Sequence, residues 1–212
     1  AERIKNMAFD KTRFGGVVAP IVNPCGEDDS LDRGALEANL TRLLATDVAG
    51  LYINGGTGDA ANLTQDERLE TAALLVPRLL AAGKLAIVHV GQTNQRQAVE
   101  LARQAAALGA HAVASIPPKK PWPQIVEYYK ALAAAGAPVI VYYIPGVTGM
   151  TAGMPELRML LDIPGVAGIK MSDWNIFLLR SVVLEYPEKV VYSGFDEMLV
   201  PGLLYGADGC IG

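Results

Sequence analysis

Cysteine and histidine are scarce in this sequence, which has two of each among its 212 residues. Two cysteines, Cys25 and Cys210, do not make the disulfide framework of a small secreted protein, so we expect both to be free thiols. No group of histidine, cysteine and acidic residues has the spacing of a metal site. A reducing cytoplasm fits this composition best.

The sequence also lacks a strong excess of charge and a long hydrophobic run. Its net charge is −4 and it has no long basic stretch, which argues against a nucleic-acid partner. The apolar runs are too short to span a membrane, and residues 1–5 lack the apolar segment of a signal peptide. With 51% hydrophobic residues, the chain is long enough for one folded domain with a sizeable core.

Short runs rich in β-branched residues alternate with stretches rich in alanine and leucine. The runs are apolar throughout, as in strands buried on both faces, and the alternation predicts a parallel sheet. The expected strands are 16–22, 50–54, 85–90, 112–116, 139–143, 166–170, 190–193 and 206–212. The expected helices include 31–46, 64–82, 93–108, 123–135 and 177–186. Eight strands at this spacing predict a single α/β domain over residues 1–212, a (β/α)8 TIM barrel.

Several helix ends are signalled by capping residues. Ser30 or Asp32 can cap the first helix, and Thr64 with Glu67 has the spacing of a capping box. Left-handed C-caps are expected at Gly83, Gly109 and Gly136. The sequence stops at Gly212, within or just after the eighth strand. We therefore expect a barrel without its eighth helix, C-terminally incomplete, with apolar surface exposed beside the first and last strands.

One apolar run ends in a lysine. Residues 166–169 read as a buried strand, so Lys170 lies at its carboxyl end, where TIM barrels carry their chemistry. Burial disfavours the charged ammonium and lowers its pKa, and a neutral amine can attack a carbonyl carbon to form a Schiff base. The alternative is a lysine whose side chain reaches past the strand end into water.

The ends of three other expected strands carry polar or aromatic residues. Residues 54–59 are rich in glycine, and with Thr57 they could hold a carboxylate or phosphate, or form only a turn. Tyr142 or Tyr143, at the end of the expected strand 139–143, could move a proton, or both could pack at the top of the barrel. Asp196 and Glu197 could bind substrate hydroxyls or cap the next helix.

Four further polar residues have a structural interpretation. His89 lies within an expected strand and His111 precedes one, and both positions are more typical of structural histidines than of catalytic ones. Lys119 and Lys120 follow the fourth strand and read as a solvated loop, although this loop overhangs the same end of the barrel.

Four motifs, in this order and spacing, point to a known family. They are Gly-Gly-Thr-Gly-Asp at 55–59, Tyr-Tyr-Ile-Pro at 142–145, Gly-Ile-Lys at 168–170 and Gly-Ala-Asp-Gly-Cys-Ile-Gly at 206–212. From Phe14 to Gly212 the chain resembles the dihydrodipicolinate synthase / N-acetylneuraminate lyase family of class I aldolases. It resembles the N-acetylneuraminate lyase branch most.

The resemblance implies roles for individual residues. Lys170 would form the imine with pyruvate or another 2-keto acid, and Tyr142 would be the proton shuttle. The carboxylate pocket of the family falls on Gly56 and Thr57. Ser172 matches a hydroxyl residue of the lyase site.

Other positions bear on the branch and the substrate. Val147 stands where the synthase branch has an arginine. The acidic pair that the lyase branch has after the strand-7 glycine matches Asp196 and Glu197, which follow Gly194. Gly56 replaces a serine or threonine, so that the carboxylate pocket loses a hydroxyl but keeps a backbone N–H.

The expected function is therefore that of a Schiff-base lyase. It would cleave N-acetylneuraminate or a similar 2-keto-3-deoxy sugar acid to pyruvate and an aldehyde, with no cofactor and no metal. The family implies a homo-oligomer, with a tetramer as its typical form. One alternative is an aldolase or dehydratase for a shorter keto-deoxy sugar acid. Another is an inactive truncated paralogue that acts by association with full-length subunits.

Overall fold

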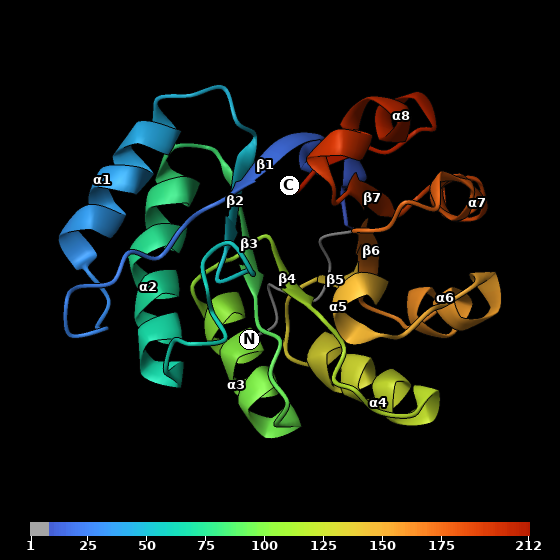
Figure 1. Ribbon diagram of the computed structural model, residues 1–212, viewed down its shortest axis with the longest axis horizontal. Coiled ribbons are helices and arrows are strands. Elements are labelled where there is room, and N and C mark those ends of the chain that lie inside the picture. The colour runs from blue at the N-terminus through green and yellow to red at the C-terminus, as the bar shows by residue number, and fades with distance from the viewer. Residues whose placement is uncertain (1–8) are drawn as a thin grey trace.

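The computed structural model describes residues 9–212, so residues 1–5, the segment without a signal-peptide pattern, lie outside the described part of the chain. Eight parallel strands form a closed barrel in chain order, with β1 paired to both β2 and β8 (Figure 1). The strands are β1 (Gly16–Pro20), β2 (Gly50–Ile53), β3 (Leu85–His89), β4 (Ala112–Ser115), β5 (Val139–Tyr143), β6 (Val166–Met171), β7 (Val190–Ser193) and β8 (Gly209–Cys210).

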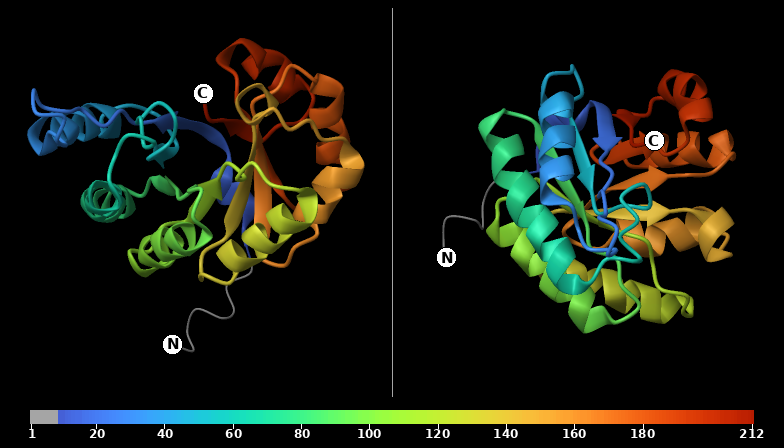
Figure 2. Two further views of the ribbon diagram at one scale, coloured as in Figure 1. Left: turned by 60° about the horizontal axis from the view of Figure 1, so that its bottom comes forward. Right: turned by 60° about the vertical axis from the view of Figure 1, so that its left-hand side comes forward.

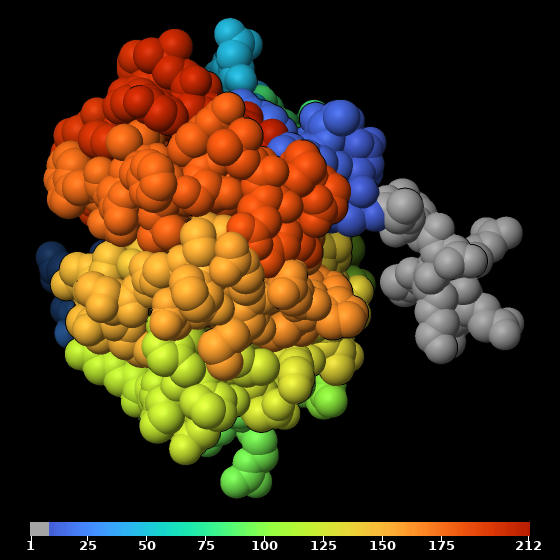
Figure 3. Space-filling model, turned by 90° about the vertical axis from the view of Figure 1, so that its right-hand side faces the viewer, coloured from blue at the N-terminus to red at the C-terminus, as the bar shows by residue number. Residues whose placement is uncertain are grey.

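The helices surround the strands (Figures 1 and 2). They are α1 (Arg33–Leu44), α2 (Gln65–Ala81), α3 (Gln95–Ala107), α4 (Trp122–Ala133), α5 (Pro145–Thr148), α6 (Met154–Leu161), α7 (Ile176–Glu185) and α8 (Leu199–Leu204), with 3₁₀ turns η1 (Lys11–Phe14) and η2 (Asp196–Met198). Figure 3 shows the face on which segments from α4 to α8 stack in chain order, from yellow-green to red. None of the described helices combines the length and the apolar character that a membrane crossing requires.

The predicted TIM barrel is confirmed, and the largest difference concerns its last strand. We expected a strand over residues 206–212, but only Gly209–Cys210 form β8. Gly206 has a positive φ of 96° and follows the end of α8, so the chain turns there before the strand begins. Three helices, α5, α6 and α8, were not among the expected ones. α5 begins at Pro145, and α6 has Gly153 at its N-cap and Pro155 in its first turn. Proline and glycine are typical of turns, so neither segment was predicted as a helix.

The predicted helix signals are confirmed. Asp32, rather than Ser30, caps α1 by accepting a hydrogen bond from the backbone N–H of Ala35. Thr64 and Glu67 form the reciprocal capping box of α2. The three glycines expected at C-caps have positive φ angles: Gly83, Gly109 and Gly136. Cys25 and Cys210 are free thiols, as expected.

Apolar side chains form two layers, one on each face of the closed sheet. Leu51 and Ile53 of β2 pack outward against the helices, whereas Tyr52 between them points into the barrel interior. This alternation explains why the strands read as continuous apolar runs. It also determines which side chains at the carboxyl end of each strand face the barrel axis.

Large apolar side chains are exposed beside the first and last strands. Val17 and Val22, in or just after β1, are each 46% exposed. Leu204 at the end of α8 is 81% exposed. Comparable side chains are exposed elsewhere, for example Phe177 at 78%, so the exposure is not confined to this part of the barrel.

Candidate active site

Lys170 occupies the next-to-last position of β6 and is buried. Gly168, two residues earlier, lets β6 approach β7 closely, because a Cβ at that position would overlap the backbone carbonyl of Val190. Burial lowers the pKa of the Lys170 amine to about 8, although the nearby carboxylate of Asp196 opposes that shift. A substantial fraction of this amine is therefore neutral near physiological pH, and the alternative of a side chain that reaches into water is wrong.

Two tyrosine rings lie beside the Lys170 amine. Its Nζ is 4.2 Å from the ring centroid of Tyr142 on β5 and 5.0 Å from that of Tyr52 on β2. The two rings meet edge to face with centroids 6.4 Å apart. Their faces favour a positive charge at Nζ and also exclude water from it. The Tyr52 hydroxyl is buried and has no hydrogen-bond partner within residues 9–212.

Ser172 connects Tyr142 to β7. Its Oγ is 3.4 Å from the Tyr142 hydroxyl and 3.2 Å from the carbonyl oxygen of Gly194, and its single proton can be donated to one of them at a time. A Cβ on Gly194 would overlap this Oγ, so glycine is required for Ser172 to fit. Burial raises the pKa of Tyr142, while the hydrogen bond from Ser172 opposes that rise. Tyr142 therefore rests as the neutral phenol, a proton donor.

Tyr143, the neighbour of Tyr142, points to the other face of the sheet. Its hydroxyl accepts a hydrogen bond of 3.0 Å from the backbone N–H of Ala152, and its ring belongs to the layer between the barrel and the helices. Of the two aromatic residues at the end of β5, Tyr143 is therefore the structural one.

The glycine-rich loop after β2 is held by two buried asparagines. Asn54 adopts a left-handed conformation with φ of 58°, and its amide donates to the carbonyl of Arg68 at 2.9 Å. Asn23, beyond β1, donates to the carbonyl of Gly58 at 2.7 Å. Gly56 and Thr57 lie at the exposed tip of this loop. The loop is thus anchored at both ends, and its tip is accessible to a ligand.

Asp196 and Glu197 lie on the β7 side of the barrel mouth, in η2, and both are exposed. The Asp196 carboxylate lies against Gly212, where a Cβ would overlap it. Neither acid caps a helix, because the N-cap positions of η2 and α8 are Phe195 and Met198, without side-chain caps. The capping interpretation of this pair is therefore wrong.

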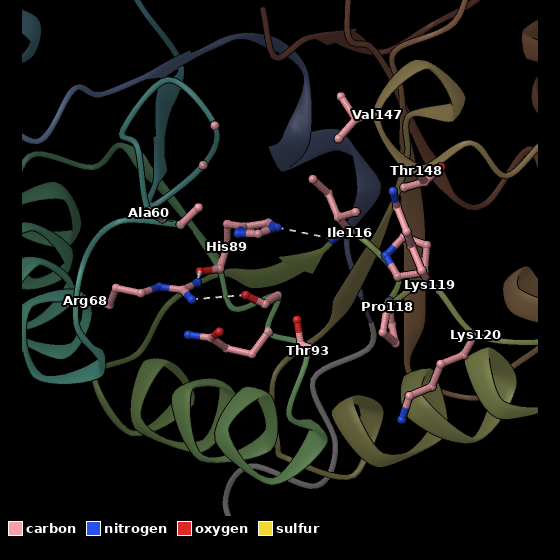
Figure 4. Close-up of a pocket in the computed structure, with 16 residues that line it drawn as sticks. Ala60, Arg68, His89, Thr93, Ile116, Pro118, Lys119, Lys120, Val147 and Thr148 are labelled. Atoms are coloured by element: carbon pink, nitrogen blue, oxygen red, sulfur yellow. Dashed lines mark hydrogen bonds between the residues drawn. The ribbon is translucent and has the colours of Figure 1, made fainter.

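A cavity of about 560 Å³ opens at the mouth on the side of β2 to β5 (Figure 4). Gly56 lines it, but Lys170, Asp196 and Glu197 do not. His89, at the end of β3, connects the cavity to the Lys170 site, because its ring centroid is 6.3 Å from that of Tyr142. Of the predicted site residues, Lys170, Tyr142, Ser172 and Gly194 therefore form a central cluster, whereas Gly56 lines the cavity and Asp196 and Glu197 lie in η2.

His89, which lines the cavity, is neutral. Its Nε2 accepts a hydrogen bond of 3.2 Å from the backbone N–H of Ile116, which places the proton on Nδ1. Burial, together with the positive charges of Arg68 and Lys170, lowers the pKa of His89 to about 3. His111, by contrast, lies away from the site, where its Nδ1 accepts from the backbone N–H of Ala86 and its Nε2 contacts Arg13. His111 is structural, as expected.

Arg68 and His89 are the residues of this region that the sequence did not single out for the site. Arg68 is 2% exposed, and its guanidinium donates to the carbonyls of His89 at 2.8 Å and Gly91 at 3.0 Å. An arginine in the first turn of an amphipathic helix usually reads as surface. Its burial becomes evident only when α2 is placed against the end of β3.

Chemically, the central cluster combines a partly neutral amine, a protonated phenol and a hydroxyl in a buried setting. An amine of this kind can attack a ketone, and the phenol can move protons to and from oxygen atoms. The loop tip at Gly56 and Thr57 offers groups suited to an anionic end of a ligand.

Comparison with known proteins agrees with this chemistry. Residues 13–212 match the dihydrodipicolinate synthetase family. An N-acetylneuraminate lyase from Rhizobium meliloti is 34% identical over 206 residues, which cover 94% of this chain and 68% of the relative. An N-acetylneuraminate lyase from Escherichia coli is 30% identical over 207 residues, which cover 95% and 69% of the two chains.

A solved structure shows the same likeness in three dimensions. CdNal from Clostridium difficile, in complex with mannosamine, has a TM-score of 0.90 and 26% sequence identity to this chain. The match covers 93% of this chain and 70% of the solved one. The chain therefore belongs to the dihydrodipicolinate synthetase family and is an enzyme of its aldolase and lyase type.

Proposed function

We propose that this enzyme is a Schiff-base lyase that cleaves a 2-keto-3-deoxy sugar acid, such as N-acetylneuraminate, to pyruvate and an aldehyde. The observation that carries the proposal is the burial of Lys170 beside the ring of Tyr142, with the amine pKa lowered to about 8. The relatives described above are N-acetylneuraminate lyases, which supports this choice of substrate.

The reaction begins at the keto carbon of the substrate. The neutral amine of Lys170 attacks the C2 carbonyl, and the resulting carbinolamine loses its hydroxyl as water. Tyr142 supplies the proton for that water, since its raised pKa keeps it protonated at rest. The products of this step are a protonated imine on Lys170 and a phenolate on Tyr142, two opposite charges that stabilise each other.

The imine on Lys170 and the phenolate of Tyr142 then cleave the C3–C4 bond of the substrate. The Tyr142 phenolate takes the proton of the C4 hydroxyl, the C3–C4 bond breaks, and its electron pair neutralises the imine as an enamine. The aldehyde leaves, the Tyr142 phenol gives its proton to C3 of the enamine, and attack of water on the imine then releases pyruvate and the free Lys170 amine while a proton returns to Tyr142. Ser172, within reach of the Tyr142 hydroxyl, holds that oxygen in position throughout.

Two ends of the substrate are assigned to different loops. The carboxylate lies at Gly56 and Thr57, and the polyol hydroxyls lie at Asp196 and Glu197, whose oxygens are acceptors. Gly194 provides the room for Ser172 between them. The family also suggests a homo-oligomer, and the tetramer is part of this proposal.

A pyruvate-release panel tests the substrate. We expect turnover of N-acetylneuraminate or a related keto-deoxy sugar acid and no condensation of pyruvate with aspartate semialdehyde, because Val147 cannot pair a second carboxylate there. Glu197→Ala should raise KM for the sugar acid while pyruvate still forms the imine. Turnover in the condensation alone would overturn the substrate class.

A further inference from the structure

Two aromatic rings meet at the mouth of the barrel, on the side of the acidic pair. Trp174 lies in the loop after β6, and Phe195 follows Gly194 in the loop after β7. Their ring centroids are 4.8 Å apart, and the ring planes are inclined by 37°. Both loops leave the carboxyl ends of strands that build the Lys170 site, so this ring pair borders the site.

The Trp174 side chain is unusually exposed for its size. It is 63% exposed although its ring contacts that of Phe195, which is half-buried. Tryptophan is highly buried on average, because its large apolar surface is costly to leave in water. An exposed indole that is held against a second ring therefore favours a ligand that covers it.

A hydrogen bond and a charge link Phe195 to the reactive lysine. The carbonyl of the residue before it, Gly194, accepts a hydrogen bond of 3.2 Å from Ser172 in the central cluster. Burial lowers the pKa of the Lys170 amine, and the carboxylate of the residue after Phe195, Asp196, lies close enough to oppose that shift. Phe195 thus stands between two residues that border the Lys170 site.

The aromatic pair and the acidic pair have complementary chemistry. A polyol chain carries hydroxyl groups, which donate hydrogen bonds to carboxylates such as those of Asp196 and Glu197. It also carries C–H groups, which are apolar and suit the electron-rich face of an indole ring. An exposed indole beside two carboxylates is therefore suited to a long uncharged polyhydroxy chain, whereas the carboxylates repel an anionic one.

We infer that Trp174, supported by Phe195, packs against the C–H face of the polyol chain whose hydroxyls the acidic pair binds. This inference rests on the proposed lyase function and favours a long substrate, because each further carbon adds apolar area that can cover the indole. N-acetylneuraminate carries five carbons beyond C4 and an acetamido methyl group, whereas a 2-keto-3-deoxy hexonate carries two carbons beyond C4.

The test compares N-acetylneuraminate with a 2-keto-3-deoxy hexonate in Trp174→Ala. We expect kcat/KM for the nine-carbon acid to fall about tenfold more than for the six-carbon acid, since the loss of contact with about two carbon groups has that magnitude. Trp174→Phe, which keeps a ring at this position, should recover most of the loss. Phe177→Ala is the matched control, because Phe177 is even more exposed, at 78%, but takes no part in the contact between Trp174 and Phe195.

Equal losses for the two substrates in Trp174→Ala, or no loss for either, would overturn the inference. Equal losses together with an altered oligomeric state in size-exclusion chromatography would assign the indole to a contact between subunits. Trapping of pyruvate with borohydride separates these failures from that of the lyase proposal, because trapping requires Lys170 and not Trp174.

If neither substrate turns over, tryptophan fluorescence decides. The chain has two tryptophans, so Trp122→Phe leaves Trp174 as the remaining one. A saturable change in its emission on addition of N-acetylneuraminate supports the inference, and a constant emission refutes it.

Discussion

At the scale of single residues, Lys170 links the chemistry of the site to the stability of the fold. Its pKa in the folded protein is about 8, below the ordinary lysine value of 10.5. The folded state thus binds this proton less well than the unfolded state. Protonation therefore destabilises the fold at pH values below 8, and the penalty disappears as the pH rises from 8 to 10.5.

Lys170→Met should accordingly stabilise the protein at pH 6.5, by on the order of 3 kcal/mol, since each pKa unit corresponds to about 1.4 kcal/mol. The gain should shrink at pH 9.5. Urea unfolding at both pH values measures it, and Lys130→Met, at an exposed lysine, should show no such pH dependence. A gain that stays constant with pH would mean that the Lys170 amine is not desolvated.

The sequence predicted some residues of the site better than others. Lys170 was predicted from its place at the end of a buried strand, whereas Tyr142 and Ser172 were predicted only from the family resemblance. In the structure, Tyr142 lies beside Lys170 because the two residues pair in the register of β5 and β6. Arg68 and His89 were not predicted as site residues, because their burial depends on how α2 docks against the end of β3. No local pattern in the sequence encodes that contact.

At the scale of elements, the capping box of α2 holds the helix that carries Arg68. The Thr64 hydroxyl accepts from the backbone N–H of Glu67 at 3.2 Å, and the Glu67 carboxylate accepts from the backbone N–H of Thr64 at 2.8 Å. The sequence predicted this box because both partners lie within one turn. It did not predict α6, whose first turn contains Pro155 after Gly153 and so reads as a loop.

Thr64→Ala should cost about 1 kcal/mol of unfolding free energy, because it leaves a backbone N–H of the first turn without its partner. For a domain of this size, the melting temperature should fall by about 3 °C. Thr41→Ala is the matched control. Thr41 is an exposed threonine in α1, and its hydroxyl donates a hydrogen bond to the carbonyl of Glu37 in the same helix and does not cap a helix end. Equal melting temperatures for the two variants would contradict a stabilising role of the box.

At the scale of the whole molecule, closure of the barrel depends on a very short strand. β8 pairs with β1 through Gly16↔Gly209 and Val17↔Cys210 and with β7 through two further pairs. Gly209 packs so closely on the backbone of Gly16 that a Cβ would overlap it. The sequence predicted the closed barrel from the number and spacing of strands. The length of β8 was not predictable, because the close approach of two glycines is a tertiary contact.

Gly209→Ala should therefore destabilise the protein by about 2 kcal/mol or more, because the strands must separate to accommodate the methyl group. Gly146→Ala is the control, since a Cβ there meets no atom within 4 Å and the change should stay within about 1 kcal/mol. The free energies of unfolding of the two variants are measured by denaturant unfolding and compared with that of the wild type. Equal stability of both variants would show that the β1–β8 contact does not limit the stability of the barrel.

The proposed lyase activity depends on an imine between Lys170 and a 2-keto acid, and this imine can be trapped by reduction. The folded protein is incubated with pyruvate and borohydride, and its intact mass is then determined. We predict the addition of one reduced pyruvyl group to the wild type and none to Lys170→Ala or to Lys170→Arg, whose guanidinium stays protonated. A folded wild-type chain that remains unmodified, or a Lys170→Ala variant that is still modified, would contradict the formation of this imine.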